Sequence, residues 1–371
     1  MAIRTVYIEP HSPEWHKFRA NGVGGSEIVT VLGSQFNEYG SRIKMFYEKI
    51  GAVKPNQEPS EVMMHGSYME DYIESWWKYF DGDIESTMRN KQLGNQIRKC
   101  RKVNGYIVND KYPWLFASPD RMIVKGQRGL IENPNGDLMF GDNLDDGGIL
   151  EFKTVNGFVA RKYVATGGIP LYQIVQLQQY MTILEINYGE FAVLEDGRHF
   201  YVAPMEFNKA LSDRIIEESH DFYVNHVVPA RELYQEYVSE YMKGNKSSAE
   251  RIQSRINSLE PDVDSSETTR EFISSRFNEV KESIQGDDVL LTQSIEYKRL
   301  SKLIKKLSER KDTVYNRLLN VCVHNECQKV ELPGGGYYKA FKRDGGKNYQ
   351  LTFSAIKHKS IDEADDIAET L

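Results

Sequence analysis

The sequence has few cysteines, no long apolar run and no excess of positive charge. Three cysteines, Cys100, Cys322 and Cys327, are too few for a disulfide framework or a four-thiolate cluster, so reduced thiols are expected. No apolar stretch approaches the roughly 20 residues that span a bilayer. The N-terminal residues contain no apolar signal segment, which predicts a cytoplasmic protein without a membrane partner. The formal net charge of −7 disfavours a generally basic nucleic-acid binder, although it is compatible with a basic channel and acidic metal ligands.

The 371 residues are enough to bury a sizeable core, and more than one unit is expected. Up to about residue 230, strand and helix patterns alternate, which predicts an α/β unit whose mixed central sheet is flanked by helices. Helical segments dominate afterwards. Apolar residues recur with coiled-coil-like spacing over Leu300–Val321, for which a helical hairpin is expected, and a β-hairpin is expected around Gly334–Gly336. We therefore place one domain at 1–230 and a mainly helical extension, ending in a β-hairpin, at 231–371.

The stretch ILEFKTV, Ile149 to Val155, carries two charged residues within an apolar run. Side chains alternate between the faces of a strand, so Glu151 and Lys153 point the same way, with Cα atoms about 6.6 Å apart. Upstream, LFASPDRMIV is a second apolar run with Asp120 where a strand begins or bends. A carboxylate and an ammonium at a sheet edge suit metal binding and the activation of a water molecule. The alternative interpretation is a structural Glu–Lys ion pair on a solvated face.

Glycines lead to Ser26 in EWHKFRANGVGGSEIVTVLG, which predicts a helix capped by Ser26 and ending near Gly33. Arg19 lies just upstream, and helix N-termini bind anions. A capped helix without a ligand is the alternative. An amphipathic helix is predicted over Ser60–Phe80, with Glu70 on its polar stripe.

The segment GIPLYQIVQLQQYMTILE predicts a further helix, on which Gln176 and Tyr180 are four residues apart and share a face. Residues 105–120 predict two strands joined by a turn. The insert at 125–148 is rich in Gly, Asn and Asp, which predicts a looped hairpin. Asp196-Gly197 predicts the turn of a further hairpin.

Taken in order, these motifs resemble the YqaJ-type viral recombinase, or lambda exonuclease, family of PD-(D/E)xK nucleases. The resemblance covers about residues 10 to 205. It rests on W-x-x-x-R with G-x-G-G-S-E-I, on HGSYME, on SPD, on EFK and on QIVQLQQY. It implies a restriction-endonuclease-like α/β core and a metal-dependent DNA exonuclease that hydrolyses linear duplex DNA from a 5′-phosphorylated end, in phage-type recombination or DNA processing.

The resemblance also assigns roles to residues of this sequence. The catalytic residues would be Asp120, Glu151, Lys153, Gln176 and Tyr180. The ligands of one or two Mg²⁺ or Mn²⁺ ions would be Glu70, Asp120, Glu151 and the backbone carbonyl of Phe152, since hard cations prefer oxygen. The phosphate-binding residues would be Arg19, Ser26 and Gln178. Lys153 would orient or deprotonate the attacking water, with a pKa lowered if it is desolvated near metal charge.

Two other functions stay open at this point. One is an endonuclease or nickase with the same site, and the other is a non-catalytic DNA-binding recombination scaffold, which the intact acidic set disfavours. DNA is the expected partner. A single-strand annealing protein and a homo-oligomer are further expectations, in the cytoplasm of a bacterial or phage-infected cell. Two features depart from the family pattern: the long insert between Asp120 and Glu151, and the residues beyond about 230.

Overall fold

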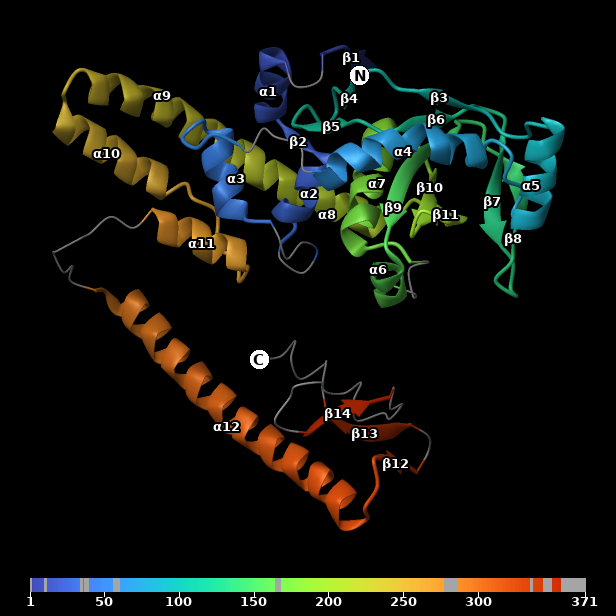
Figure 1. The fold of residues 1–371 in the computed structure, drawn as a ribbon. Helices are drawn as coiled ribbons and strands as arrows, with labels where there is room; N and C mark the ends of the chain where they lie inside the picture. Colours follow the sequence, from blue (N-terminus) through green and yellow to red (C-terminus); the bar gives the residue numbers. More distant parts are fainter. Residues whose placement is uncertain are drawn as a thin grey trace. The chain divides into compact units, whose positions relative to one another are not determined.

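The computed structural model describes residues 2–9, 12–33, 36, 40–55, 61–163, 168–276, 286–333, 336–342 and 349–354. The chain divides into two compact units, Met1–Asn278 and Glu279–Leu371, whose elements are labelled in Figure 1. None of the helices in the described ranges is both long enough and apolar enough to cross a membrane.

A mixed five-stranded sheet forms the centre of the first unit, with strand order β11-β10-β9-β6-β3. β9 and β10 are parallel, and the other neighbours are antiparallel, as expected for a mixed sheet. A parallel pair needs a crossover connection, which α6 (Gly157–Lys162) and α7 (Leu171–Leu184) provide. The five strands are β3 (Cys100–Lys102), β6 (Arg121–Ile123), β9 (Gly148–Val155), β10 (Tyr188–Glu195) and β11 (His199–Glu206).

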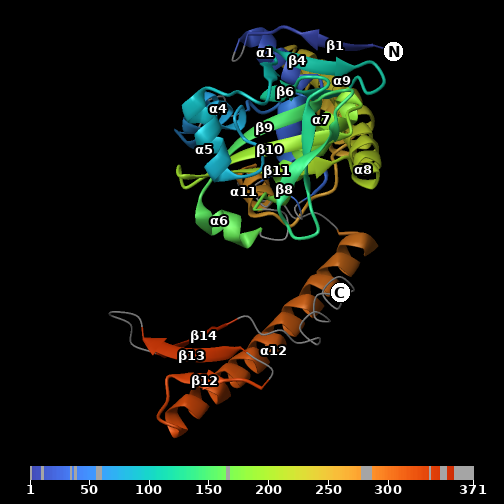
Figure 2. The same cartoon turned by 90° about the vertical axis from the view of Figure 1, so that its right-hand side faces the viewer.

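Helices cover both faces of this sheet (Figures 1 and 2). Because side chains of a strand alternate, β9 directs Ile149 into a core that it shares with Leu177 and other residues of α7. It directs Leu150 and Phe152 to the opposite core, where they pack with Trp77 of α4 (Glu61–Trp77). Glu151 and Lys153 therefore belong to the α7 face, which agrees with the alternation expected from the sequence.

The apolar run around Asp120 serves two sheets. β5 (Leu115–Ala117) joins a four-stranded sheet of order β1-β4-β5-β2, whereas β6 belongs to the central sheet. The other strands of the four-stranded sheet are β1 (Ile3–Val6), β2 (Val23–Gly24) and β4 (Tyr106–Asn109). Asp120 lies directly before β6, so the chain changes sheets next to this carboxylate.

Both predicted hairpins of the first unit are confirmed. The insert forms an antiparallel pair, β7 (Arg128–Glu132) and β8 (Leu138–Asn143). β10 and β11 meet at Asp196 and Gly197, whose φ values of 51° and 68° are those of a hairpin turn with two left-handed residues. The remaining helices before residue 200 are α1 (Pro13–Ala20), α2 (Gly25–Val31), α3 (Arg42–Lys49) and α5 (Ile84–Leu93).

The first unit extends beyond the boundary expected at residue 230. Ile252, Ile256 and Phe272 are buried in the same core as α2 and α7, so the helices that carry them belong with the α/β unit. The unit accordingly ends at Asn278. These helical segments are α8 (Lys209–His220), the π-helical η2 (Asp221–Val227), α9 (Val228–Met242), α10 (Lys246–Asn257) and α11 (Glu267–Ser275).

Among its described residues, the second unit has one helix, α12 (Asp288–His324), of 37 residues. The helical hairpin expected around residues 300–321 is therefore wrong, because the whole segment continues as a single helix. The predicted β-hairpin is confirmed and gains a third strand, in the order β12-β13-β14. Its strands are β12 (Lys329–Glu331), β13 (Tyr337–Lys342) and β14 (Tyr349–Phe353). Cys100, Cys322 and Cys327 are free thiols, as expected. The acidic end of the sequence, 361–371, lies outside the described residues.

Candidate active site where strands β6 and β9 separate

Two carboxylates meet where β6 and β9 separate. The ladder between these strands ends at Arg121 opposite Leu150. Beyond it, the backbone N–H of Phe152 donates to Asp120 Oδ2 at 2.8 Å, and the backbone N–H of Asp120 donates to Glu151 Oε1 at 3.3 Å. Side-chain carboxylates thus replace the backbone ladder at this point, and the structure brings Asp120 and Glu151 together as the sequence predicted.

Lys153 completes this centre from the same face of β9. Its Nζ lies 3.0 Å from Glu151 Oε2, and the two side chains are 17% and 2% exposed. Burial, together with the negative charge of Asp120, raises the pKa of Glu151 to about 8. Burial acts to lower the pKa of Lys153, but the carboxylates of Glu151 and Asp120 outweigh it, so this pKa is raised. The lowered pKa expected beside a metal is therefore not the state of the metal-free site, in which Lys153 is held as a cation.

Gln176 and Tyr180 of α7 lie next to the carboxylates. The Gln176 amide donates to the Tyr180 hydroxyl at 3.0 Å, as expected for residues one helical turn apart. Burial, and then the charge of Glu151, raise the pKa of Tyr180 well above its ordinary value, so its hydroxyl remains a hydrogen-bond donor. A Cβ atom on Gly25 would lie 2.4 Å from the Tyr180 ring. The start of α2 therefore packs directly against this tyrosine, which explains the need for glycine there.

Two cations share one carboxylate beside α2. Glu27 accepts from Lys49 Nζ at 2.9 Å and lies 3.2 Å from the Arg19 guanidinium. Burial acts to raise the pKa of Glu27, but Lys49 and Arg19 outweigh it, so this pKa is lowered. Arg19, Lys49 and Glu27 together thus carry one net positive charge. Arg19 also lies over the Trp15 ring, 5.0 Å from its centroid.

Ser26 does not have the predicted capping position. The N-cap of α2 is Gly24, whose N–H donates to Glu27 Oε2 at 2.8 Å. The Glu27 side chain, rather than the Ser26 hydroxyl, accepts the hydrogen bond at this end of the helix. Ser26 lies in the first turn, where it is exposed.

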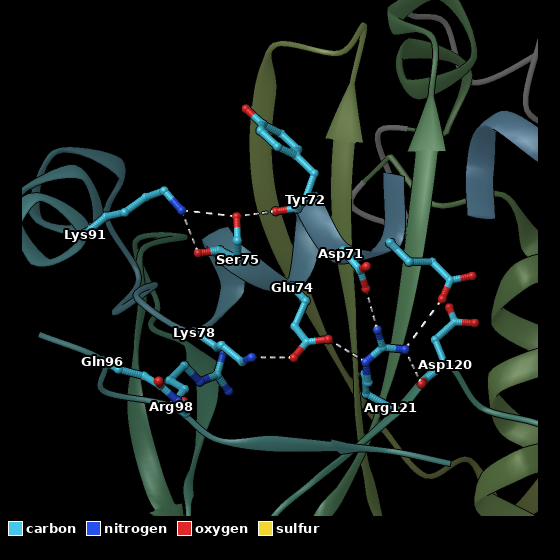
Figure 3. Close-up of polar contacts among 11 residues, drawn as sticks. Asp71, Tyr72, Glu74, Ser75, Lys78, Lys91, Gln96, Arg98, Asp120 and Arg121 are labelled. Atoms are coloured by element: carbon cyan, nitrogen blue, oxygen red, sulfur yellow. Dashed lines mark hydrogen bonds and ion pairs between the residues drawn. The ribbon is translucent and has the colours of Figure 1, made fainter. Parts of the chain in front are cut away.

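Arg121 connects the strand that follows Asp120 to α4, the helix that carries Glu70. Figure 3 shows Arg121 beside Asp71, Glu74 and Asp120. Its side chain is 4% exposed and contacts three carboxylates of α4: Glu70 at 3.5 Å, Asp71 at 3.3 Å and Glu74 at 2.5 Å. It also donates to the backbone carbonyl of Asp120 at 2.8 Å. Burial and then the charge of Asp120 raise the pKa of Glu70. The sequence reasoning missed Arg121, although a charged residue inside the apolar stretch of a strand was a signal for it.

One family model matches the part of the chain that carries these residues. Residues 14–187 match the model of the YqaJ-like viral recombinase domain. This segment is a YqaJ-like domain. It includes every predicted site residue, from Arg19 to Tyr180. No curated protein sequence matches the chain.

The solved structures that are similar to the chain include the following three, all at low identity. One is an alkaline exonuclease (LHK-Exo) from Laribacter hongkongensis, with 17% identity, a TM-score of 0.41, and coverage of 63% of this chain and 99% of that one. Another is a phage-related exonuclease from Haemophilus somnus 129PT, with 11% identity, a TM-score of 0.35, and coverage of 60% and 98%. The third is SSO0001, with 13% identity, a TM-score of 0.28, and coverage of 55% and 76%.

Gln178 has a structural place in the YqaJ-like domain. Its amide nitrogen donates to the Glu206 carbonyl and its amide oxygen accepts from the Asn208 N–H, each at 2.8 Å. The side chain is buried. Both ends of the amide are thus used to connect β11 to α8, so the predicted contact of Gln178 with DNA phosphate is wrong. Its neighbour Gln179, which the sequence reasoning also missed, donates to carbonyls of β2 and β5.

The acidic residues of the YqaJ-like domain fit a hard divalent cation by their donor chemistry. Burial, and then the negative charge of Asp120, raise the pKa values of Glu151 and Glu70, and a bound divalent cation would act in the opposite direction on both. Among the described residues, however, no group of three or more His, Cys, Asp or Glu lies close enough to hold a metal ion. Asp120 and Glu151 lie next to each other, whereas Glu70 contacts Arg121.

Proposed function

We propose that the chain is a metal-dependent DNA exonuclease that hydrolyses linear duplex DNA from 5′-phosphorylated ends, in phage-type recombination or DNA processing. The observation that carries this proposal lies where β6 and β9 separate in a YqaJ-like domain: Glu151 accepts from the Asp120 N–H and forms an ion pair with Lys153. An Asp before one strand and Glu-x-Lys on the next, in a mixed sheet covered by helices, also supports a PD-(D/E)xK core.

Bound Mg²⁺ or Mn²⁺ would supply Lewis-acid stabilisation of charge on the phosphate oxygens. Asp120, Glu151 and the backbone carbonyl of Phe152 would hold it, with Glu70 as a further ligand. Lys153, cationic beside Glu151, would donate a hydrogen bond that orients the attacking water or a phosphate oxygen. Lys153 could take a proton from water only after its ammonium group had lost a proton.

Two further side chains would bind the scissile phosphate from α7. The Tyr180 hydroxyl keeps its proton because its pKa is raised, so it would donate to a phosphate oxygen. Gln176, already in contact with that hydroxyl, would hold its orientation or donate to the same phosphate.

The preference for a 5′-phosphorylated end rests on the charge beside α2. Arg19 and Lys49 share the single carboxylate of Glu27, so Arg19 can turn to a phosphate while Lys49 still neutralises Glu27. A terminal phosphate carries close to two negative charges and an internal diester carries one, so the terminal group gains more from this excess charge. Gly25, at the start of α2, packs against Tyr180, which lies next to the carboxylates. Ser26, exposed in the first turn of α2, would add a hydroxyl contact.

The test compares three forms of one DNA sequence, namely a linear duplex with 5′-phosphate ends, the same duplex with 5′-hydroxyl ends, and a covalently closed circle. With Mg²⁺ we expect the phosphorylated duplex to be degraded fastest and the circle to resist. A chelator, Asp120→Asn or Glu151→Gln should abolish cleavage. Near-normal cleavage by either variant, or by the wild type in chelator, would exclude the proposed centre.

Arg19→Ala should remove most of the preference for 5′-phosphate while cleavage of 5′-hydroxyl ends continues. Arg128→Ala is a matched control, because Arg128 contacts two carbonyls of β8 and the Phe140 ring, all within its own hairpin. Efficient cutting of closed circles, without dependence on 5′ phosphorylation, would assign an endonuclease or nickase instead. DNA binding without cleavage of any form would assign a non-catalytic scaffold.

A further inference from the structure

Helix α12 concentrates positive charge in a chain whose formal net charge is −7. Between Lys298 and Lys311 the sequence has seven Lys and Arg residues and one acidic residue, Glu309. All of these residues are exposed. Since each residue of an α-helix turns by about 100°, six of the seven basic residues project from one side, which we call the basic face. It consists of Lys298, Arg299, Lys302, Lys305, Lys306 and Arg310, with Glu309 as the one acidic residue among them.

The basic face has few anionic partners within the chain. In the part of the chain that the structure describes, an ion pair is formed only by Arg299, with Glu296 at 3.7 Å. Exposed lysines on other helices differ: Lys209 lies 2.6 Å from Asp213, and Lys243 lies 2.8 Å from Glu240. A helix that carries this much unpaired charge of one sign is suited to bind an external polyanion.

We propose that the basic face of α12 binds the phosphate backbone of duplex DNA. The choice of duplex DNA as the polyanion rests on the proposed function. The face spans about 18 Å from Lys298 to Arg310 at 1.5 Å per residue, which corresponds to about five base pairs. A single α-helix also matches the width of the DNA major groove, about 12 Å. α12 lies outside residues 14–187, so this contact is additional to those of the YqaJ-like domain.

Two other occupants fit the observations less well. Helices that lie on a membrane surface carry Trp, Phe or Leu on their apolar side, and α12 has Leu but neither Trp nor Phe. A second copy of the chain, packed through the exposed Leu300, Leu303 and Leu307, would bring two basic faces close together, where like charges repel.

The experiment uses the full chain and a fluorescently labelled linear duplex in the presence of a chelator, so that binding is measured without cleavage. Lys302→Glu/Lys306→Glu is compared with the control Lys209→Glu/Lys243→Glu. Both double variants change the formal charge equally, but the control lysines already have acidic partners. In about 0.1 M salt we expect the first variant to lose about 10- to 100-fold in affinity and the control to lose less than 3-fold.

Salt dependence gives a second measurement. Each lost phosphate contact lowers the slope of log K against log [salt] by about 0.9, so Lys302→Glu/Lys306→Glu should lower its magnitude by about 1.8. Equal losses in both double variants, or an unchanged slope, would overturn the proposal. It would also be overturned if this variant lost binding to phosphatidylserine vesicles, or lost self-association, while duplex binding stayed the same.

Cleavage assays separate this proposal from the proposed function. If the wild type cleaves duplex DNA while Lys302→Glu/Lys306→Glu binds normally, the role of α12 is wrong and the exonuclease stands. If the wild type does not cleave but the variant loses duplex binding, the role of α12 stands and the exonuclease is wrong. If both are correct, KM should rise in the variant while kcat stays unchanged, because no residue of the proposed centre lies on α12.

Discussion

Arg121→Met tests whether a buried arginine holds α4 against the strand that follows Asp120. Methionine keeps an apolar stem beside the Phe152 ring, whose centroid is 5.2 Å from the guanidinium, and removes the charge. The contact with Asp71 contributes little, because that carboxylate is 92% exposed. Glu74, 16% exposed and 2.5 Å from Arg121, provides most of the effect.

Removal of one partner from a buried ion pair costs about 3–5 kcal/mol. Glu74 keeps a second cation, Lys78, at 2.5 Å, so we expect the free energy of unfolding of Arg121→Met to fall by about 3 kcal/mol, the lower end of that range. Cleavage should fall as well, because Glu70 loses its contact and the Asp120 carbonyl loses its donor.

Urea unfolding monitored by tryptophan fluorescence measures the stability, and Asp71→Asn is the control that should leave the midpoint unchanged. In a double-mutant cycle, Arg121→Met/Glu74→Leu should be less destabilised than the sum of its two single variants, because neither charge is then left alone. Wild-type stability of Arg121→Met, or strict additivity in the cycle, would refute this reasoning. Normal cleavage by the destabilised variant would restrict Arg121 to a structural role.

Three further predictions concern the candidate centre. Lys153→Ala should lower the cleavage rate at least about 10²-fold with little change in melting temperature; unchanged cleavage with a sharp loss of stability would instead indicate a structural ion pair. Gly25→Ala should destabilise the protein by about 1–3 kcal/mol and slow cleavage, since its Cβ would meet the Tyr180 ring at 2.4 Å, whereas Gly66→Ala, with open space around it in α4, should not destabilise it. In metal-free protein, the raised pKa of Glu151 gives a stability contribution that is present below its unfolded value of 4.5 and lost as pH rises through about 8. Mg²⁺ should therefore raise the melting temperature more at pH 8 than at pH 6, and an equal rise at both would contradict a site at Glu151.

Several features of this protein follow from the sequence alone, because they depend on backbone geometry over a few residues. The two-residue period of a strand places Glu151 and Lys153 on one face, and the 3.6-residue period of a helix places Gln176 beside Tyr180. Asp196-Gly197 predicts its hairpin because both residues accept positive φ. The order of these motifs also predicted the family of residues 14–187.

Other features were decided only by the tertiary structure, because they depend on partners far away in the sequence. Gln178 is a glutamine of the same helix as Gln176, and nothing in the neighbouring sequence separates their roles. In the structure, Gln178 contacts the backbone of Glu206 and Asn208 and connects β11 to α8. Arg121 shows its role only when α4 packs on the sheet and brings acidic residues some 50 positions earlier against it. The first unit ends at Asn278 because Ile252 and Phe272 find their apolar partners in the α/β core, and no local pattern in a helix reveals which distant surface will bury it.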